Sequence, residues 1–267
     1  MIGVELRKLL RRPRTWVSIL LLCLLPTVVA VFLAVSDVAP RPGTGPAFLS
    51  AVLENGALYP AAALAIVLPL FLPVAVAVVA GDAVAGEAQA GTLRYLLIRP
   101  VGRTRLLVAK LVSVVAYTVL AVVAVAAVAY VVGVQLFGSG PLPSTSGQDL
   151  STTQATLRTV LAVLYVGWSM LGVAAVALFL STVTDSPLAA ALGAIALLVT
   201  SGVLVGLEAS ASVQPYLPTR YWLAFVDLFR DPVLARDLVR GVGLQAVYIA
   251  VFLTAAWANL MTKDVTS

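Results

Sequence analysis

Six stretches of this sequence are each long and apolar enough to cross a lipid bilayer as a helix. The hydrocarbon core of a bilayer is about 30 Å thick, and a helix needs about 20 apolar residues to span it. The stretches that meet this length, none with an acidic residue in its middle, are 16–35, 57–80, 106–136, 159–179, 188–207 and 241–260. We therefore expect an all-α integral membrane protein with six transmembrane helices in a single domain, 1–267.

The composition excludes a soluble protein. Only 11% of the residues are charged and 61% are hydrophobic, whereas a soluble globular chain has about 25% charged residues. A water-facing surface built from this composition would expose large apolar patches and aggregate. The net charge of +5 comes from basic residues that flank the apolar stretches. We therefore expect contact with the membrane surface and none with nucleic acid.

Several kinds of reactive site are also excluded. The chain contains no histidine, one cysteine (Cys23) and three scattered methionines. It therefore lacks the residues for a Ser-His nucleophile pair, an intrachain disulfide or a histidine-based zinc site. We expect no metal and no cofactor to be bound by this chain.

The distribution of basic residues predicts the orientation. Cytoplasmic segments of membrane proteins are enriched in Lys and Arg. If the N-terminus is cytoplasmic, eleven basic residues lie on or next to the inner side and six on the outer side. We therefore expect a multi-pass protein of the cell membrane with both termini in the cytoplasm. The segment 208–240 contributes little to this assignment because its four arginines are balanced by acidic residues.

The N-terminal residues "MIGVELRKLLRRPRTW" have the pattern of an amphipathic helix. Apolar residues share one helical face, basic residues surround it, and Pro13 follows before the first apolar stretch. Such a helix lies in the headgroup layer of a membrane, although the same residues also fit a simple anchor that orients the first span. The residues assigned to this interfacial helix are Leu6, Leu9, Leu10, Arg11 and Arg12.

A second short apolar segment, "YLPTRYWLAFVDLF" (216–229), precedes the last span. It is too short to cross a membrane, and Pro218 and Pro232 interrupt its region. We expect a short external re-entrant or interfacial helix pair here.

The segment 81–105 lies between two very apolar stretches and contains charged residues, glycines and a proline. Connections between neighbouring helices usually have about 2–8 residues, so this one is unusually long. Thr92 is a suitable N-cap for a short helix that presents Leu93, Leu96 and Leu97 on one face. Glu87, Gly91 and Arg94 also share a face if the helix is continuous. These apolar residues predict a cytoplasmic element that docks on a partner.

Catalysis by the chain itself is not expected. Gly81 and Gly86 have the spacing of a phosphate-binding loop, but Glu87 follows where such a loop requires lysine. Polar residues inside the spans lack an acid or histidine to activate them. Candidate residues for a translocation path are Pro69, Pro73, Tyr117, Tyr165, Ser169 and Thr200.

The stretch "GEAQAGTLRYLLIRPVGRTRLLVAK" (86–110) resembles the region after the second transmembrane helix of ABC-2-type permeases, the membrane subunits of ABC exporters. The resemblance includes the acid, the Gly-Thr-Leu, the Leu-Leu pair, the Pro-Val-x-Arg and the final lysine. Arg94 and Tyr95 stand where the family often has an acid. The matching residues are Glu87, Gly91, Thr92, Leu93, Leu96, Leu97, Pro100, Val101, Arg103 and Lys110.

The resemblance implies a coupling helix that sits in a groove of a separate ATPase subunit, with Glu87, Gly91, Thr92, Leu93, Arg94, Leu96, Leu97, Pro100 and Arg103 as the coupling residues. It also implies that ATP and Mg²⁺ bind to that subunit, and that a second or related permease completes the complex. The function expected is ATP-driven export of an amphiphilic substrate such as a drug, an antibiotic or a lipid-like molecule. The alternative is an ATP-independent membrane protein, either a secondary carrier or a membrane assembly or immunity factor. A membrane enzyme is a more distant alternative.

Overall fold

The apolar stretches fold into helices, several of which extend past the apolar residues themselves. In the computed structural model, residues 2–36, 55–91, 102–138 and 151–262 are described. Six helices in this part are long and apolar enough to span a membrane, and no strand is present there. They are α2 (Pro13–Val35), α5 (Phe71–Gln89), α7 (Arg103–Phe137), α8 (Thr152–Val183), α9 (Pro187–Gly206) and α10 (Ala235–Thr262). The expected all-α membrane protein is therefore confirmed.

The expected second span, 57–80, is divided and displaced. Its first part forms the 3-10 helix η1 (Gly56–Leu58) and the helix α4 (Tyr59–Val67), and α5 begins only at Phe71. Pro69 lies at the break and Pro73 in the first turn of α5, and neither has the N–H that a helix continuous from α4 would require. Helix α5 then continues to Gln89. Residues 81–89, which were expected to belong to the connecting segment 81–105, are therefore helical.

Two long helices exceed the thickness of a membrane. Helix α7 has 35 residues, which corresponds to about 52 Å at 1.5 Å per residue, against about 30 Å for a hydrocarbon core. Helix α8 has 32 residues and starts with a capping box, in which the Ser151 hydroxyl accepts from the Gln154 N–H and the Gln154 side chain accepts from the Ser151 N–H. Both helices therefore extend beyond the apolar stretches that predicted them.

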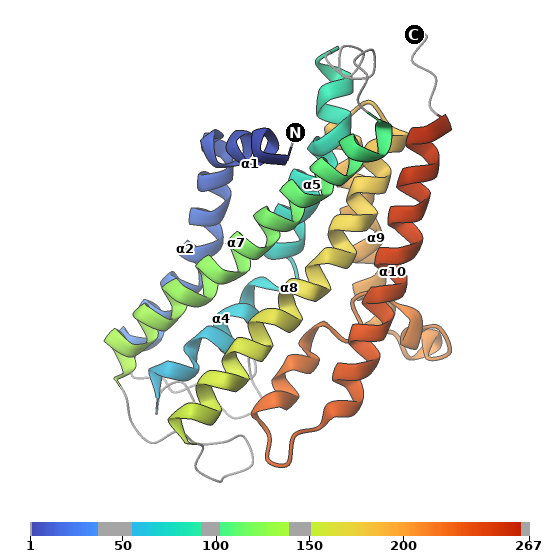
Figure 1. Cartoon of the computed structure of the whole chain (residues 1–267). Helices are drawn as coiled ribbons and strands as arrows, with labels where there is room; N and C mark the ends of the chain where they lie inside the picture. The colour runs from blue at the N-terminus through green and yellow to red at the C-terminus, as the bar shows by residue number, and fades with distance from the viewer. Residues whose placement is uncertain (1, 37–54, 92–101, 139–150, 263–267) are drawn as a thin grey trace.

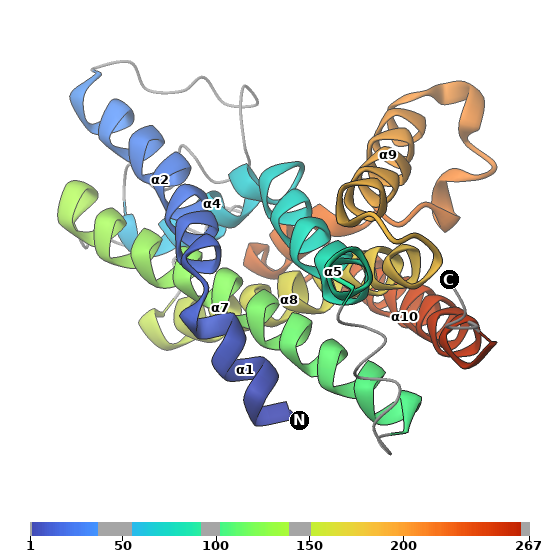
Figure 2. The same ribbon diagram turned by 90° about the horizontal axis from the view of Figure 1, so that it is seen from above.

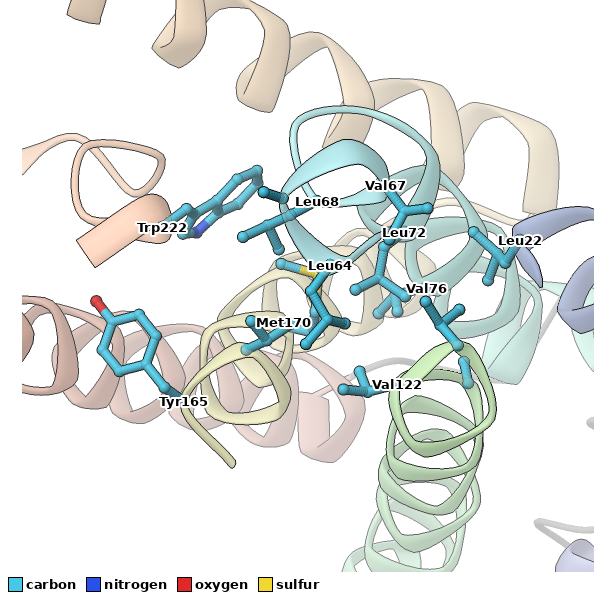
Figure 3. Close-up of a cluster of buried hydrophobic side chains, with 14 of the residues drawn as sticks. Leu22, Leu64, Val67, Leu68, Leu72, Val76, Val122, Tyr165, Met170 and Trp222 are labelled. Carbon is cyan, nitrogen blue, oxygen red and sulfur yellow. The ribbon is translucent and has the colours of Figure 1, made fainter. Parts of the chain in front are cut away.

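The core forms around α4, α5 and α8. Residues 59–65 of α4 are all buried, and α8 contacts α5, α7, α9 and α10. Figure 3 shows Leu64, Leu72 and Val76 gathered with Met170 of α8 and Val122 of α7. Helix α2 lies at the edge of the bundle and packs mainly against α7 (Figures 1 and 2).

A close contact joins η1 to α7. A Cβ atom at Gly56 would overlap the backbone of Gly133, and one at Gly133 would overlap Gly56. Only residues without a side chain allow the two backbones to approach in this way. The contact positions η1 and the start of α4 against the last turns of α7.

The N-terminal residues form a separate helix, α1 (Ile2–Arg11). Pro13 stands at the first position of α2, where its missing N–H removes no helical hydrogen bond. Helix α1 turns away from the direction of α2 and lies across α7 (Figures 1 and 2), where Leu9 is buried. Only Leu9 of the apolar face is buried in this way, since Ile2 and Leu10 are exposed, and the position of α1 relative to a membrane stays a prediction.

The segment before α10 contains three 3-10 helices, η2 (Glu208–Ser210), η3 (Gln214–Tyr216) and η4 (Trp222–Phe229). Pro218 lies between η3 and η4, and the external, re-entrant placement expected for this segment stays a prediction. Helix η4 packs against α8 and α10 and buries Trp222, Phe225 and Phe229. Aromatic residues therefore anchor this segment to the bundle.

Candidate functional site

Ion pairs join seven charged side chains near one end of the bundle. Helix α1 and the end of α10 both lie at this end (Figure 1). The seven side chains come from three regions of the sequence: the N-terminal residues, α5 and the start of α7. We refer to them as the ionic cluster, which consists of Glu5, Lys8, Arg12, Arg14, Asp82, Glu87 and Lys110.

Lys110 is the most buried member of the ionic cluster, with only 3% of its surface exposed. Its ammonium group forms an ion pair with Glu87 of α5 and a second one, at 3.1 Å, with Glu5 of α1. Glu87 is also buried and accepts a further ion pair from Lys8 at 3.1 Å. Charges at this burial are stable only when they are paired. The ion pairs therefore fasten α1, α5 and α7 to one another.

A second group of ion pairs lies beside the first. Arg12 pairs with Asp82 at 3.0 Å, and Arg14 pairs with the same carboxylate oxygen. Asp82 is therefore shared by two guanidinium groups, one on each side of Pro13. These contacts hold the junction between α1 and α2 against α5.

The same part of α5 has an inserted hydroxyl group. Ser181 of α8 donates to the Gly81 carbonyl at 2.6 Å and accepts from the N–H groups of Val84 and Ala85 at 3.0 and 2.9 Å. The hydroxyl thus enters the backbone ladder of α5 between Asp82 and Glu87. A side chain inserted in this way is a recognised cause of local helix bending, and it attaches the end of α5 to α8.

The start of α7 is attached to the end of α10. The Arg103 guanidinium donates to the carbonyls of Leu260 and Met261 at 3.1 and 2.7 Å. The Trp257 indole donates to the Thr104 hydroxyl at 3.0 Å. Because the last carbonyls of a helix have no partner within the helix, Arg103 supplies hydrogen bonds to two of them at the end of α10.

These contacts define the ends of the connection 90–102. Helix α5 ends at Gln89, Gly91 has a φ of 67°, and α7 begins at Arg103. Glu87, Gly91 and Arg94 were expected to share a helical face only if one helix continued through all three positions. Helix α5 ends before Gly91, so that helix is not continuous. The positive φ interrupts the helix, and glycine adopts it without strain.

The structure assigns different positions to the expected coupling residues. Glu87 lies within α5 in the ionic cluster, Gly91 lies just past the end of α5, and Arg103 caps α10. The expected Thr92 cap and the residues Leu93, Arg94, Leu96, Leu97 and Pro100 lie outside the described residues. Glu87 and Arg103 thus make contacts inside the chain that hold the two ends of the connection.

A cavity of about 580 Å³ opens beside the ionic cluster. It lies between α2 and α5 and is closed by α1 and α7. All seven members of the ionic cluster line one end of it, and mostly apolar residues, with the hydroxyl-bearing Thr15, Ser18 and Ser113, line the rest. The principal apolar lining residues are Leu21, Leu22, Phe71, Val74, Ala75 and Val78.

The six residues expected to line a translocation path are not brought together. Pro69 and Pro73 line a smaller apolar cavity of about 220 Å³ between the α4–α5 break, α9 and η4. Tyr117 is buried and hydrogen-bonds to Ser18 at 2.8 Å, and Tyr165 donates to the Tyr221 carbonyl at 2.6 Å. Ser169 is buried and Thr200 is exposed on α9. The Tyr117 and Tyr165 side chains therefore form hydrogen bonds that connect different elements of the bundle.

Sequence reasoning missed most of the ionic cluster. The pairing of Glu5, Lys8, Asp82 and Lys110 was not expected, although Lys110 is one of the residues that carry the resemblance. The available signal was that two acids and a lysine lie beside very apolar stretches, where a charge needs an opposite partner. That signal does not identify the partner, because Lys8 and Glu87 are far apart in the sequence.

Comparison with known proteins identifies a family but no activity. Residues 19–266 match the model of a family described as protein of unknown function, DUF2705. The chain belongs to this family. The match contains Asp82, Glu87 and Lys110, and it begins after α1. No curated protein is detectably similar to the chain.

Proposed function

We propose that this DUF2705 protein is the permease subunit of an ABC-2-type exporter, which a separate ATPase drives through the connection 90–102. The observation that carries the proposal is the buried ion pair between Glu87 and Lys110. These residues lie on the two helices that the connection joins. A force applied to the connection therefore reaches α5 and α7 together.

The surroundings of the connection support the same role. Ser181 fastens the end of α5 to α8, and Arg103 fastens the start of α7 to α10. Lys8 and Glu5 add the N-terminal helix. A connection whose ends are attached to three further helices transmits a displacement to the bundle, whereas a loosely attached loop would absorb it.

The mechanism follows from thermodynamic coupling. ATP and Mg²⁺ would bind to the partner ATPase, and a second permease copy or a related permease would complete the path. ATP drives the cycle only if the ATPase binds two conformations of the permease with different free energies. The apolar residues Leu93, Leu96 and Leu97 are the contacts through which we expect this difference to act, and the substrate expected is amphiphilic.

The test compares two matched substitutions in the tagged full-length chain, Leu96→Glu in the connection and Leu234→Glu at the opposite end of the bundle. Leu234 is 48% exposed. We expect the wild type and Leu234→Glu to co-purify with an ATP-hydrolysing subunit, and Leu96→Glu to insert normally but lose that subunit. Buried apolar contacts of this size are worth about 1.5–3 kcal/mol each, so we expect a loss of roughly tenfold or more.

The contradicting result is equally specific. A wild-type chain that purifies from mild detergent without any ATP-hydrolysing subunit contradicts the permease role. That result favours the ATP-independent alternatives, of which a secondary carrier transports when reconstituted alone. A product formed from a substrate by the isolated chain would instead indicate a membrane enzyme.

A further inference from the structure

The cavity between α2 and α5 has a charged end and an apolar end. Asp82 and Glu87 lie at the charged end, and Phe71 lies near the start of α5. Between them, the lining residues Phe71, Ala75, Val78 and Asp82 recur every three or four positions, so one face of α5 forms the wall. A volume of about 580 Å³ is within the usual range for pockets that bind small molecules, about 300–1,000 Å³.

The depth of the cavity corresponds to one leaflet of a bilayer. Phe71 and Asp82 are eleven positions apart on one helix, which corresponds to about 16 Å at 1.5 Å per residue. Half of a hydrocarbon core of about 30 Å is about 15 Å. An acyl chain with its headgroup at the ionic cluster therefore reaches the apolar end of the cavity.

The cavity opens sideways on the apolar surface of the bundle. Leu21 is 57% exposed, Val78 is 50% exposed and Phe71 is 47% exposed, although all three line the cavity. Neighbouring residues of α2, including Leu20 and Leu24, are also exposed. In a membrane, lipid tails are the molecules in contact with such an opening.

The charged residues at the open end of the cavity determine which kind of lipid headgroup fits there. Among the described lining residues, four are basic and three are acidic. Within this set, Asp82 is shared by Arg12 and Arg14, and the Arg14 side chain is 57% exposed. One positive charge is therefore left uncompensated next to the open end, and arginine is well suited to bind a phosphate group.

We propose that this cavity binds one acyl chain of an anionic glycerophospholipid from the surrounding bilayer, with the lipid phosphate held by Arg12 and Arg14. The lipid then occupies the space between α2 and α5. Its phosphate adds a fourth negative charge to the three carboxylates of the ionic cluster. The site is complete within this chain. Its occupancy does not depend on an ATPase or on transport.

The experiment measures bound lipid on the purified full-length chain by native mass spectrometry. The protein is equilibrated in mixed micelles with phosphatidylglycerol or with phosphatidylcholine at equal concentration. We expect one tightly retained phosphatidylglycerol and roughly tenfold weaker retention of phosphatidylcholine, because the net charge of the zwitterionic headgroup is zero.

Two pairs of variants locate the site. Val78→Trp fills the cavity, and Val251→Trp places the same side chain on the exposed face of α10, where valine is 56% exposed. We expect Val78→Trp to lose the retained lipid and Val251→Trp to keep it. Arg14→Gln should lower the preference for phosphatidylglycerol roughly fivefold or more, and Arg236→Gln at the other end of the bundle should leave it unchanged.

Three results would overturn the proposal. The first is equal retention of the two lipids by the wild type, which would indicate nonspecific solvation. The second is full retention by Val78→Trp, which would place the lipid elsewhere. The third is a dimer joined by a disulfide between cysteines introduced at Leu21 and Val78 in a Cys23→Ser background, which would identify a second copy of the chain as the occupant. None of these results bears on ATPase association, so the two proposals fail separately.

Discussion

Lys110 shows what a single charge contributes in this apolar chain. It lies on α7 with its side chain 4% exposed and pairs with Glu5 and Glu87. Removal of one member of a buried ion pair leaves the other charge buried without its partner, which typically costs about 3–5 kcal/mol. The residue therefore holds three helices, and its loss affects all of them.

We expect Lys110→Met to lower the free energy of unfolding by about 3 kcal/mol because Glu87 then loses its most buried partner. Thermal unfolding in mild detergent measures the effect, with Arg236→Met, an exposed residue of α10, as the control. Combining Lys110→Met with Glu87→Leu should recover most of the loss, since both buried charges are then absent. Equal stability of Lys110→Met and the control would show that the ion pair contributes nothing.

The sequence predicted residue types better than residue partners. The apolar face with Leu9 follows from local periodicity, which depends only on neighbours in the chain. Glu87 was expected to face a partner protein because the residues around it resemble a docking motif. It faces Lys110 and Lys8 instead, and these contacts depend on how distant helices pack.

At the scale of elements, α1 is held by charge more than by its apolar face. Leu9 is its only described buried residue, whereas Glu5 and Lys8 form ion pairs with α7 and α5. Arg12 and Arg14 at the α1–α2 junction depend on Asp82. The position of α1 should therefore respond to changes in α5 that leave α1 itself untouched.

We expect Asp82→Asn to loosen α1 and to speed tryptic cleavage at Arg7, Lys8 and Arg11 roughly tenfold, because local opening controls access to the backbone. Mass spectrometry of timed digests of the protein in detergent measures the rate. Asp237→Asn is the matched control, since Asp237 also pairs with an arginine but at the exposed start of α10. Unchanged cleavage in Asp82→Asn would show that α1 is held without Asp82.

Helix ends were predicted less well than helix existence. All six long helices correspond to apolar stretches, but α5, α7, α8 and α10 extend beyond them. The missing information lies in capping and ion pairing. Residues 81–89 were expected to belong to a polar connection. They are helical because Asp82 and Glu87 form ion pairs with basic residues of α1, α2 and α7.

At the scale of the whole molecule, an even number of long helices returns the chain to the side where it began. Helix α1 and the end of α10 lie at the same end of the bundle, together with the end of α5 and the start of α7 (Figure 1). The positive-inside rule predicts that this end is cytoplasmic. An ATPase that binds cytoplasmic ATP reaches the connection only in this orientation.

We expect a cysteine at Gln89, in a Cys23→Ser background, to react with a membrane-impermeant maleimide only after the cells are opened. A cysteine at Ser146, between α7 and α8 in the sequence, should react in intact cells. Mass tagging on a gel measures both. Labelling of the Gln89 position in intact cells would reverse the orientation and exclude a cytoplasmic ATPase at the connection.

On the proposed function, a partner ATPase uses ATP to move this chain by acting on the connection 90–102. Spin labels at Gln89, which is exposed at the end of α5, report that movement as the distance between two permease copies in the purified complex, measured by double electron–electron resonance. We predict that ATP and Mg²⁺ shift the distance distribution in the wild type and that Leu96→Glu abolishes the shift. A complex that hydrolyses ATP with an unchanged distance distribution would contradict the claim.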